Sequence, residues 1–448
     1  MLRSSLVVGL LASVVVLGGA CGGGSSVGPS RQGTQSDAGT VGQGGGAGLP
    51  CDVDKVLADN CRGCHSAPPQ FGSPMPLVTW DDLHAGAPSD AARKVHDMVV
   101  ARIADDARPM PPSPNPRLSP ADRKTLADWV AAGAPRGESD CNTTTKPIPE
   151  GLSCSPDLSL APESEWEMPN SAGDEYVCWG VDLARDPATH ITAFAPRIDN
   201  TKIVHHVVLY EATSAYSRTP KSCNAGAAIT WRMVLGWAPG TKGFELPPDV
   251  GFPVSSDPAN PTHYVVQMHY SNPQKLAGEK DKSSIDLCTS APRKYEADVM
   301  AFGSQDFTIP AAPPAGGRYT VDCALTVPSA FAGLHLFAAM PHMHKLGVAM
   351  STTLEPAGGG PAVDLGTMQS FSFDSQAWLP IDATTKSGDV IRTKCSWVNG
   401  TGETVGFGEN TADEMCYSFT MYYPRIASSL WSWAAPASGP PIGATCTE

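Results

Sequence analysis

The sequence has few charged residues, only 17% of its 448, and no apolar run after residue 21 that is long enough to span a bilayer. Its formal net charge of −14 argues against a nucleic-acid partner. Glycine and proline are plentiful instead, with 44 and 42 residues. This composition favours turn-rich β architecture over long helices, and the length favours two or three domains.

The first 21 residues have the pattern of a secretion signal. Arg3 gives a positive start, residues 6–17 an apolar run, and small residues at 18–20 precede Cys21. This end is similar to a bacterial lipoprotein cleavage site and predicts a lipid on Cys21, whereas ordinary cleavage would leave that cysteine free. Residues 22–50 are rich in Gly and Ser and predict a flexible tether. We therefore expect an exported protein, lipid-anchored to the periplasmic or cell-surface side of a bacterial membrane.

The sequence Cys61-Arg-Gly-Cys64-His65 has the spacing of a c-type haem attachment site. The two cysteines would bind the haem vinyl groups, and His65 would ligate the iron. A redox dithiol or half of a zinc site is the alternative, but the sequence has no second cysteine pair of this spacing. Residues 51–141 show helical periodicity around the motif and resemble a small monohaem cytochrome c.

A second axial ligand for the iron is expected from the loop before the last helix. Met110 lies there between prolines, which stiffen the loop. Met75 is the competing thioether, and His84 or His96 would give bis-histidine ligation instead. Ligation by His65 and Met110 would raise the reduction potential relative to two nitrogen ligands.

From Cys154 onward, short segments rich in Val, Thr, Tyr and Phe alternate with Gly, Pro and Asn turns. This pattern is typical of antiparallel sandwiches. We therefore expect a multidomain chain, in which an all-α domain (51–141) precedes two all-β sandwich lobes (154–302 and 303–448).

Several of the chain's 11 histidines are clustered in expected strands. His205 and His206 are neighbours, so their side chains should point to opposite faces, and one metal binds both only if the strand is distorted or the rings use different nitrogens. His269, in another expected strand, offers a third nitrogen. His342 and His344 are spaced i and i+2, which places both on one face.

A methionine, Met415, adds a thioether to these imidazoles, and this combination suits copper. A blue-copper site is not expected, because no cysteine sits beside a histidine in the usual arrangement. Single histidines in strands are more often hydrogen-bonded core residues, and His190, His263 and His335 are interpreted in that way.

Six motifs of residues 154–448 indicate a family: Val204-His-His-Val207, Leu246-Pro-Pro-Asp-Val-Gly-Phe252, Gln267-Met-His-Tyr270, His335-Leu-Phe-Ala338, His342-Met-His-Lys-Leu-Gly347 and Asp413-Glu-Met-Cys416. They resemble the ascorbate-dependent type II copper monooxygenases, typified by peptidylglycine α-hydroxylating monooxygenase and dopamine β-monooxygenase. The resemblance implies two sandwich (jelly-roll-like) lobes, each holding one copper, that face each other across solvent.

The resemblance also implies which residues bind each copper. The electron-storing copper would be bound by His205, His206 and His269. The oxygen-activating copper would be bound by the catalytic set His342, His344 and Met415. The family further implies O₂, a small-molecule substrate, and ascorbate or another external reductant.

Of the 13 cysteines, 10 remain after Cys21, Cys61 and Cys64 are assigned, and an even number fits five disulfides in an oxidising compartment. Cys51 and Cys141 bracket the expected haem domain and would form one. The family resemblance implies the other four: Cys154–Cys288, Cys178–Cys223, Cys323–Cys446 and Cys395–Cys416.

Two positions depart from the peptide-hydroxylating members of the family. Met340 replaces an arginine that holds the peptide carboxylate, and Phe419 replaces a tyrosine that assists it. One disulfide of that branch also lacks its cysteines here. Peptide amidation is therefore not expected, and an apolar pocket for a neutral or aromatic small molecule fits better.

The sequence thus predicts a copper-dependent monooxygenase that hydroxylates a C–H bond, with electrons supplied through the fused haem domain. A different hypothesis is a non-enzymatic copper and haem electron-transfer or copper-binding lipoprotein. A third is a sandwich whose histidines are purely structural. The haem domain would alternatively be a separate electron module without contact to the copper lobes.

Overall fold

The structure, a computed structural model, describes residues 48–426 and 444–447, with gaps at 138–140, 144–151, 170–172, 224–230, 239–242, 312–316 and 409–411 and at positions 72, 107, 113–114, 142, 273 and 374. The expected signal, the lipid site Cys21 and the tether as far as residue 47 lie outside the described residues. All described residues fall within one compact unit, Gln43–Glu448.

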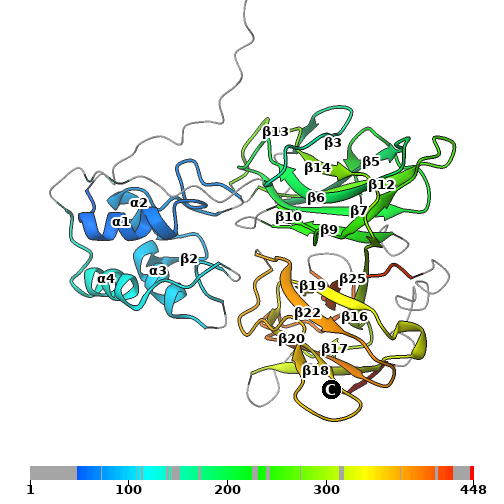
Figure 1. Cartoon of the computed structure of the whole chain (residues 1–448). Coiled ribbons are helices and arrows are strands. Elements are labelled where there is room, and N and C mark those ends of the chain that lie inside the picture. Colours follow the sequence, from blue (N-terminus) through cyan, green and yellow to red (C-terminus); the bar gives the residue numbers. More distant parts are fainter. Residues whose placement is uncertain are drawn as a thin grey trace, which may run out of the picture. The chain divides into compact units, whose positions relative to one another are not determined.

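The described residues before position 138 are mainly helical and have their own apolar core. The elements are α1 (Cys51–Asn60), α2 (Trp80–His84), β1 (Gly86–Ala87), β2 (Asp90–Lys94), α3 (Val95–Ala104) and α4 (Pro120–Ala131), in blue and cyan in Figure 1. The antiparallel β1–β2 hairpin corrects the all-α expectation for this region. Leu49, at the end of the expected tether, is fully buried in the core, because an apolar side chain gains from leaving water.

Two helices in this region, α2 and α4, begin at residues whose side chains cap them. The Ser119 side chain accepts the backbone N–H of Asp122, and Pro120 occupies the first position of α4. Thr79 and Asp82 form a reciprocal capping box at α2.

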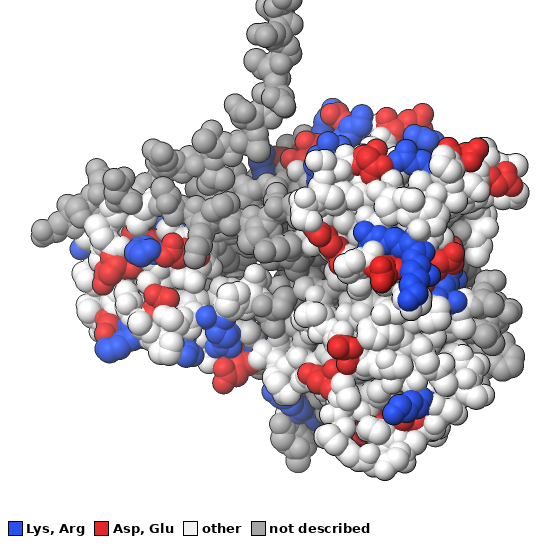
Figure 2. Space-filling model, viewed as in Figure 1, with Lys and Arg blue, Asp and Glu red and all other residues white. Residues whose placement is uncertain are grey.

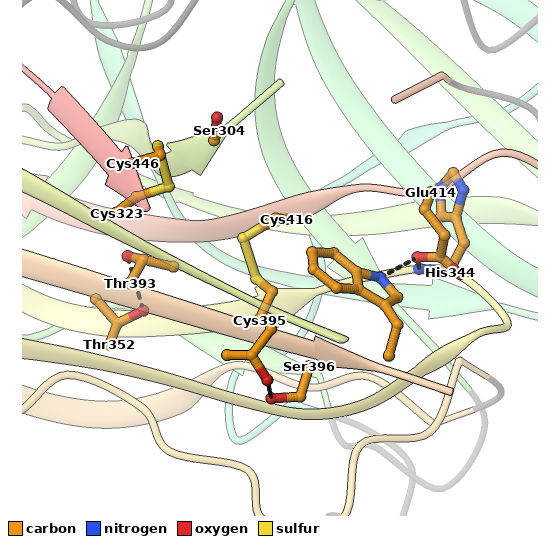
Figure 3. The surroundings of a disulfide bond; sticks show 12 residues. Ser304, Cys323, His344, Thr352, Thr393, Cys395, Ser396, Glu414, Cys416 and Cys446 are labelled. Carbon is orange, nitrogen blue, oxygen red and sulfur yellow. Dashed lines mark hydrogen bonds between the residues drawn. A yellow bond between two sulfur atoms is a disulfide. The ribbon is translucent and has the colours of Figure 1, made fainter. Parts of the chain in front are cut away.

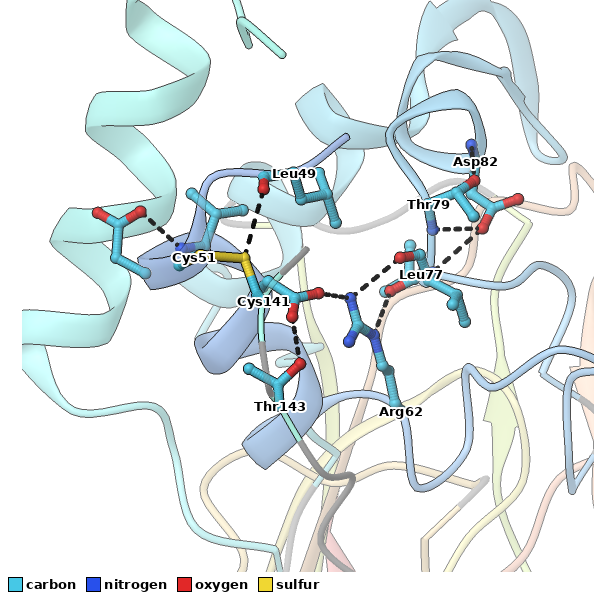
Figure 4. Close-up of polar contacts among 12 residues, drawn as sticks. Leu49, Cys51, Arg62, Leu77, Thr79, Asp82, Cys141 and Thr143 are labelled. Atoms are coloured by element: carbon cyan, nitrogen blue, oxygen red, sulfur yellow. Dashed lines mark hydrogen bonds and ion pairs between the residues drawn. A yellow bond between two sulfur atoms is a disulfide. The ribbon is translucent and has the colours of Figure 1, made fainter. Parts of the chain in front are cut away.

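The loop after α1 is held by a buried arginine. Arg62 lies within the Cys61–His65 motif and donates to the carboxylate of Asp54 (2.5 Å) and to the carbonyl of Leu77 (2.9 Å). Figure 4 shows Arg62 and Leu77 beside the Cys51–Cys141 disulfide, which ties the start of α1 to the end of the region. The loop that carries Cys61 and Cys64 is therefore anchored through Arg62 to α1 and to the backbone at Leu77.

The first β lobe consists of two main antiparallel-rich sheets. One has the order β15-β11-β6-β14-β3, with β10 on β6, and the other has the order β8-β5-β12-β7-β9. Its strands are β3 (Leu158–Leu160), β4 (Trp166–Glu167), β5 (Asp174–Leu183), β6 (Thr189–Arg197), β7 (Val204–Ala212), β8 (Lys221–Ser222), β9 (Arg232–Trp237), β10 (Phe244–Glu245), β11 (Val250–Val254), β12 (Thr262–Ser271), β13 (Lys280–Asp281), β14 (Ser284–Ser290) and β15 (Tyr295–Glu296).

The second β lobe also has two main sheets, with orders β16-β25-β19-β22 and β21-β20-β23-β18-β26. Its elements are β16 (Asp298–Ser304), β17 (Thr308–Ile309), β18 (Tyr319–Thr326), the short 3₁₀ helix Ser329–Phe331, β19 (His335–His342), β20 (Gly347–Glu355), β21 (Val363–Asp364), β22 (Leu379–Thr384), β23 (Val390–Trp397), β24 (Val405–Gly406), β25 (Cys416–Tyr423) and β26 (Ala444–Thr447). Buried and exposed residues alternate along β18 and β23, as expected for strands with one face in the core.

The chain passes from one lobe to the other between β15 and β16. β15 pairs with β11 of the first lobe, and β16 pairs with β25 of the second. The chain therefore crosses between the lobes before it reaches Gly303. The sequence pattern placed the boundary near Gly303. Gly303 is a strand residue with φ of +154° beside the carbonyl of Cys416, so glycine is required there by a close backbone approach rather than by a linker.

The structure contains the five expected disulfides: Cys51–Cys141, Cys154–Cys288, Cys178–Cys223, Cys323–Cys446 and Cys395–Cys416. Within the described part of the chain, no helix has the length and apolar character needed to cross a membrane. On the face seen in Figure 2, acidic and basic side chains lie interspersed rather than gathered by sign.

Candidate metal centres

The first histidine cluster lies where β7 pairs with β12. His269 is opposite His206, but the next residue, Tyr270, is opposite Val204, so His205 is the extra residue of a β-bulge. The bulge cancels the alternation of faces and brings both neighbouring rings to His269. The Nδ1 of His269 lies 3.2 Å from the Nδ1 of His205 and 3.2 Å from the Nδ1 of His206.

The outer nitrogens of this cluster are engaged by the protein. His206 donates from Nε2 to the carbonyl of Phe373 (3.0 Å), and His269 donates from Nε2 to the carboxylate of Asp174 (3.0 Å). Tyr176 stacks on the ring of His269, with ring centroids 4.4 Å apart. These contacts fix the rings so that Nδ1 is the atom each turns toward the centre.

Burial favours the neutral form of two of these imidazoles, His206 and His269, which is the form that binds a metal. It lowers the pKa of His206 well below its usual value, and the neighbouring histidines lower it further. Burial also lowers the pKa of His269 to about 4, although the hydrogen bond to Asp174 acts in the opposite direction. A metal therefore does not have to displace a proton from either ring near neutral pH.

The second histidine cluster lies at the end of β19. His342 is the last residue of the strand, and His344 lies after the strand has ended. The i, i+2 spacing within one strand, which the sequence suggested, is therefore not what brings the two side chains together. Their ring centroids are nevertheless 5.3 Å apart. Each ring is held from Nδ1: His342 donates to the side-chain oxygen of Gln376 (2.6 Å), and His344 donates to the carbonyl of Asp413 (3.0 Å).

This arrangement uses the opposite nitrogen from the first cluster. A metal between His342 and His344 would be bound through Nε2, whereas the first cluster presents Nδ1. Burial, with His344 adding to it, lowers the pKa of His342 to about 3, so this ring is also neutral.

A buried glutamate, Glu414, supports the second cluster, and sequence reasoning did not identify its role. Its carboxylate accepts the N–H groups of His344 (2.8 Å) and Leu346 (2.6 Å) and the indole N–H of Trp397 (2.9 Å). Burial raises the pKa of Glu414 to about 7, against the effect of these hydrogen bonds. Its only sequence signal was its place in the motif that contains Met415.

Met415 is half-buried and follows Glu414 directly. Figure 3 shows Glu414 beside His344 and the Cys395–Cys416 disulfide close by. Cys416 begins β25, and its disulfide ties that strand to β23. The backbone on both sides of the Met415 thioether is therefore anchored, one side to the His344 turn and the other to the sheet.

Phe373 connects the two histidine clusters. Its ring centroid lies 5.0 Å from that of His206, 6.2 Å from His205 and 5.7 Å from His344. The two clusters, one from each lobe, thus share one aromatic neighbour.

Both positions that depart from the peptide-hydroxylating branch carry buried or half-buried apolar side chains. Met340 is 4% exposed and packs against Gly236 of β9, where an added Cβ would lie 2.8 Å from the methionine sulfur. The ring centroid of Phe419 lies 5.6 Å from that of His342. The second cluster therefore has an apolar aromatic neighbour in Phe419.

The histidines interpreted as structural have partners in their own lobes. His190 accepts the N–H of Arg293 (3.0 Å), His263 pairs with Asp182 (2.6 Å), and His335 lies 3.3 Å from the hydroxyl of Thr384. Among the described residues, the histidine, cysteine and carboxylate groups that could hold a metal converge at His205, His206 and His269.

The Cys61–His65 motif also has features that suit its expected ligand. Cys61 and Cys64 are half-buried and form no disulfide. His65 donates from Nδ1 to the carbonyl of Met75 (2.9 Å), so Nε2 is the nitrogen that would ligate an iron if haem were attached here. The backbone of Met110 is fixed by a hydrogen bond from its N–H to the carbonyl of Arg102 (3.0 Å).

Comparison with known proteins assigns the two lobes. The sequence model of the copper type II ascorbate-dependent monooxygenase N-terminal domain matches residues 162–277, and that of the C-terminal domain matches residues 295–436. The chain belongs to this family. The two matches together cover more than half of the chain and include all six expected copper ligands.

The family's curated members are related to the chain at moderate identity. It is 30% identical to DBH-like monooxygenase protein 1 of Homo sapiens over 261 residues, which are 53% of the chain and 42% of that protein. It is 27% identical to dopamine beta-hydroxylase of Bos taurus over 277 residues, which are 57% of the chain and 45% of that protein. The chain thus spans less than half the length of these relatives.

Among solved structures, VP2 of infectious bursal disease virus aligns with the chain at 9% sequence identity and a TM-score of 0.15. The alignment covers 66% of this chain and 75% of the VP2 chain.

Proposed function

We propose that the chain is a copper-dependent monooxygenase that hydroxylates a C–H bond of a small organic substrate with O₂. The observation that carries the proposal is the pair of histidine clusters that both contact Phe373. In the first cluster the Nδ1 atoms face one another. In the second cluster each Nδ1 is hydrogen-bonded to the protein, so Nε2 is the nitrogen that would bind a metal. Neutral imidazoles together with the Met415 thioether suit copper in both oxidation states, and copper supplies one-electron chemistry and O₂ activation when bound.

The chain's own residues divide the work between the clusters. His205, His206 and His269 form a three-nitrogen site whose rings are fixed by Asp174 and Phe373, which suits a copper that stores an electron. His342, His344 and Met415 form a site with a soft sulfur ligand, which suits a copper that meets O₂. The apolar ring of Phe419 beside His342, and the apolar Met340 two residues before His342, favour a neutral or aromatic substrate over a peptide carboxylate.

We further propose that residues 51–141 hold one covalently attached haem c, bound by Cys61, Cys64 and His65, with Met110 as the second axial ligand. Its role would be to deliver electrons to the copper lobes, with ascorbate or another external reductant as the ultimate source. The proposal is supported by the fixed Cys61–His65 loop and by the Nδ1–H hydrogen bond of His65. We also propose export and anchoring to a bacterial membrane through a lipid on Cys21.

A non-enzymatic copper and haem electron-transfer lipoprotein is the second candidate function. It shares every metal ligand with the monooxygenase but has no substrate. The two are separated by whether O₂ uptake depends on an added organic compound.

The decisive experiment mixes haem-reduced, copper-loaded protein with O₂ and follows haem absorbance by stopped flow, in the parent and in Met415→Ala. The expected result is rapid haem oxidation in the parent and at least a tenfold slower reaction in the variant. His263→Ala is the matched control, because this histidine lies at the opposite end of β12 from His269, pairs with Asp182 and is not among the expected copper ligands. Equal rates in parent and Met415→Ala would exclude haem as the internal donor, and O₂ uptake with a panel of aromatic compounds would then test the copper lobes alone.

A further inference from the structure

A continuous chain of hydrogen bonds joins the two histidine clusters. His342 donates from Nδ1 to the side-chain oxygen of Gln376 (2.6 Å). The side-chain NH₂ of Gln376 donates to the carbonyl of Phe373 (3.0 Å). The same carbonyl accepts the Nε2–H of His206 (3.0 Å). One amide and one carbonyl therefore link a ring of the first lobe to a ring of the second.

The geometry fixes the orientation of the Gln376 amide. A carbonyl oxygen has two lone pairs, so Phe373 can accept from His206 and Gln376 together. A flipped amide would place its oxygen against this carbonyl oxygen and its NH₂ against the Nδ1–H of His342. Both contacts would be repulsive, so only the observed orientation satisfies all three partners.

Burial makes this chain of bonds costly to break. Gln376 is 5% exposed and Phe373 is 7% exposed, so water does not readily replace a lost partner. A buried donor or acceptor without a partner costs about 1–3 kcal/mol. The ring of Phe373 adds packing on His206 and His344, so a displacement of either ring moves the same residue.

We propose that Gln376 is a positioning residue that couples the occupancy of the two metal sites, an inference that rests on the proposed function. A metal bound to His342 would restrict the imidazole ring of that residue. The ring would then hold the side chain of Gln376 through its hydrogen bond, and Gln376 would hold the carbonyl of Phe373, which positions His206. The first cluster is thereby preorganised, so it binds metal more tightly when the second is filled. Linkage requires the reverse effect to be equal.

The test measures Cu(II) binding to the His205, His206 and His269 cluster of the full chain, by equilibrium dialysis with the electron paramagnetic resonance signal as readout. Affinity is compared between the parent and His344→Ala, in which the second cluster is disabled. We expect about tenfold weaker binding in His344→Ala, within the usual range of coupling between sites. In a Gln376→Leu background, the same comparison should show no difference.

Two controls separate coupling from a general disturbance. Ser375→Ala changes a fully buried neighbour in the same segment that takes no part in the chain of bonds, so the tenfold difference should persist. Exchange of the Nε2–H of His206, followed by NMR in the metal-free protein, should accelerate in Gln376→Leu, although the substituted residue does not touch His206.

The outcomes distinguish a failure of the coupling between the sites from a failure of the proposed monooxygenase function. If either cluster of the parent binds no copper, the proposed function fails. If both bind copper and the tenfold difference is the same with and without Gln376, the function stands and the coupling is overturned.

Discussion

At the scale of single residues, the ligands were readable from the sequence, but the groups that orient them were not. His205, His206 and His269 were recognisable from their motifs, because the residue type itself carries the metal chemistry. Gln376 and Asp174 have no such signal. Each becomes meaningful only through a hydrogen bond to a ring that is distant in sequence, and such pairs are created by the fold.

Glu414 illustrates this class of residue and gives a prediction. Replacing it by glutamine keeps the size but turns one acceptor into an NH₂ group, which would face the N–H of Leu346 or His344. We expect Glu414→Gln to lower the free energy of unfolding by about 1–3 kcal/mol, the cost of a buried donor left without an acceptor. Urea titration of the metal-free protein measures it.

The matched control for Glu414 is Glu355→Gln. Glu355 of β20 is 39% exposed and pairs with Arg392 of the neighbouring strand β23, so removing its charge should change stability by less than about 1 kcal/mol. If both variants showed the same small change, the buried carboxylate would not be the anchor of the His344 turn.

At the scale of elements, the alternating strand pattern predicted the sandwiches but failed at the metal sites. Alternation set His205 and His206 on opposite faces, whereas the bulge in β7 turns both toward His269. It also placed His342 and His344 within one strand, whereas β19 ends at His342. Bulges and strand ends depend on pairing partners, which a single strand's sequence does not reveal.

The link between β23 and β25 gives the prediction at this scale. Cys395–Cys416 closes a segment of 21 residues and anchors the residue after Met415. Its removal in Cys395→Ser/Cys416→Ser should lower the free energy of unfolding by about 2–4 kcal/mol. It should also weaken copper binding more at the His342 cluster than at the His205 cluster, which Cu(II) titration of each site would report.

The control for this disulfide is the pair Cys323–Cys446, which joins β18 to β26 in the same lobe. The double serine variant of this pair should lose comparable stability but retain full copper affinity. Equal losses of copper affinity in the two double variants would mean that the effect comes from loosening the lobe, not from the position of Met415.

At the scale of the whole molecule, the lobes are joined by apolar packing and by a buried charge cluster. The largest core combines residues of both lobes, among them Trp237 from β9 and Phe337 from β19. Beside it, Asp298 of β16 is fully buried and lies 3.2 Å from Arg232 of β9.

The charge cluster between the lobes balances two cations against two anions. Arg425 lies 3.0 Å from Glu211 of the first lobe and 3.8 Å from Asp298 of the second, and the hydroxyl of Tyr422 donates to Asp298 (3.1 Å). Burial raises the pKa of Asp298, while the two arginines act to lower it. The carboxylate thus depends on both arginines for its charge.

Arg425→Met should therefore destabilise the joined lobes far more than the loss of a surface pair. We expect a loss of about 3–5 kcal/mol, because one partner of a buried ion pair is removed and Asp298 is left undercompensated. Arg185→Met, which breaks an exposed pair with Asp157 within the first lobe, should cost less than about 1 kcal/mol. Urea unfolding followed by tryptophan fluorescence measures both, and a double variant Arg425→Met/Asp298→Asn should recover part of the loss because it removes the stranded charge. A loss in Arg425→Met no greater than in Arg185→Met would show that apolar packing alone holds the lobes, and with them the two histidine clusters, at their separation.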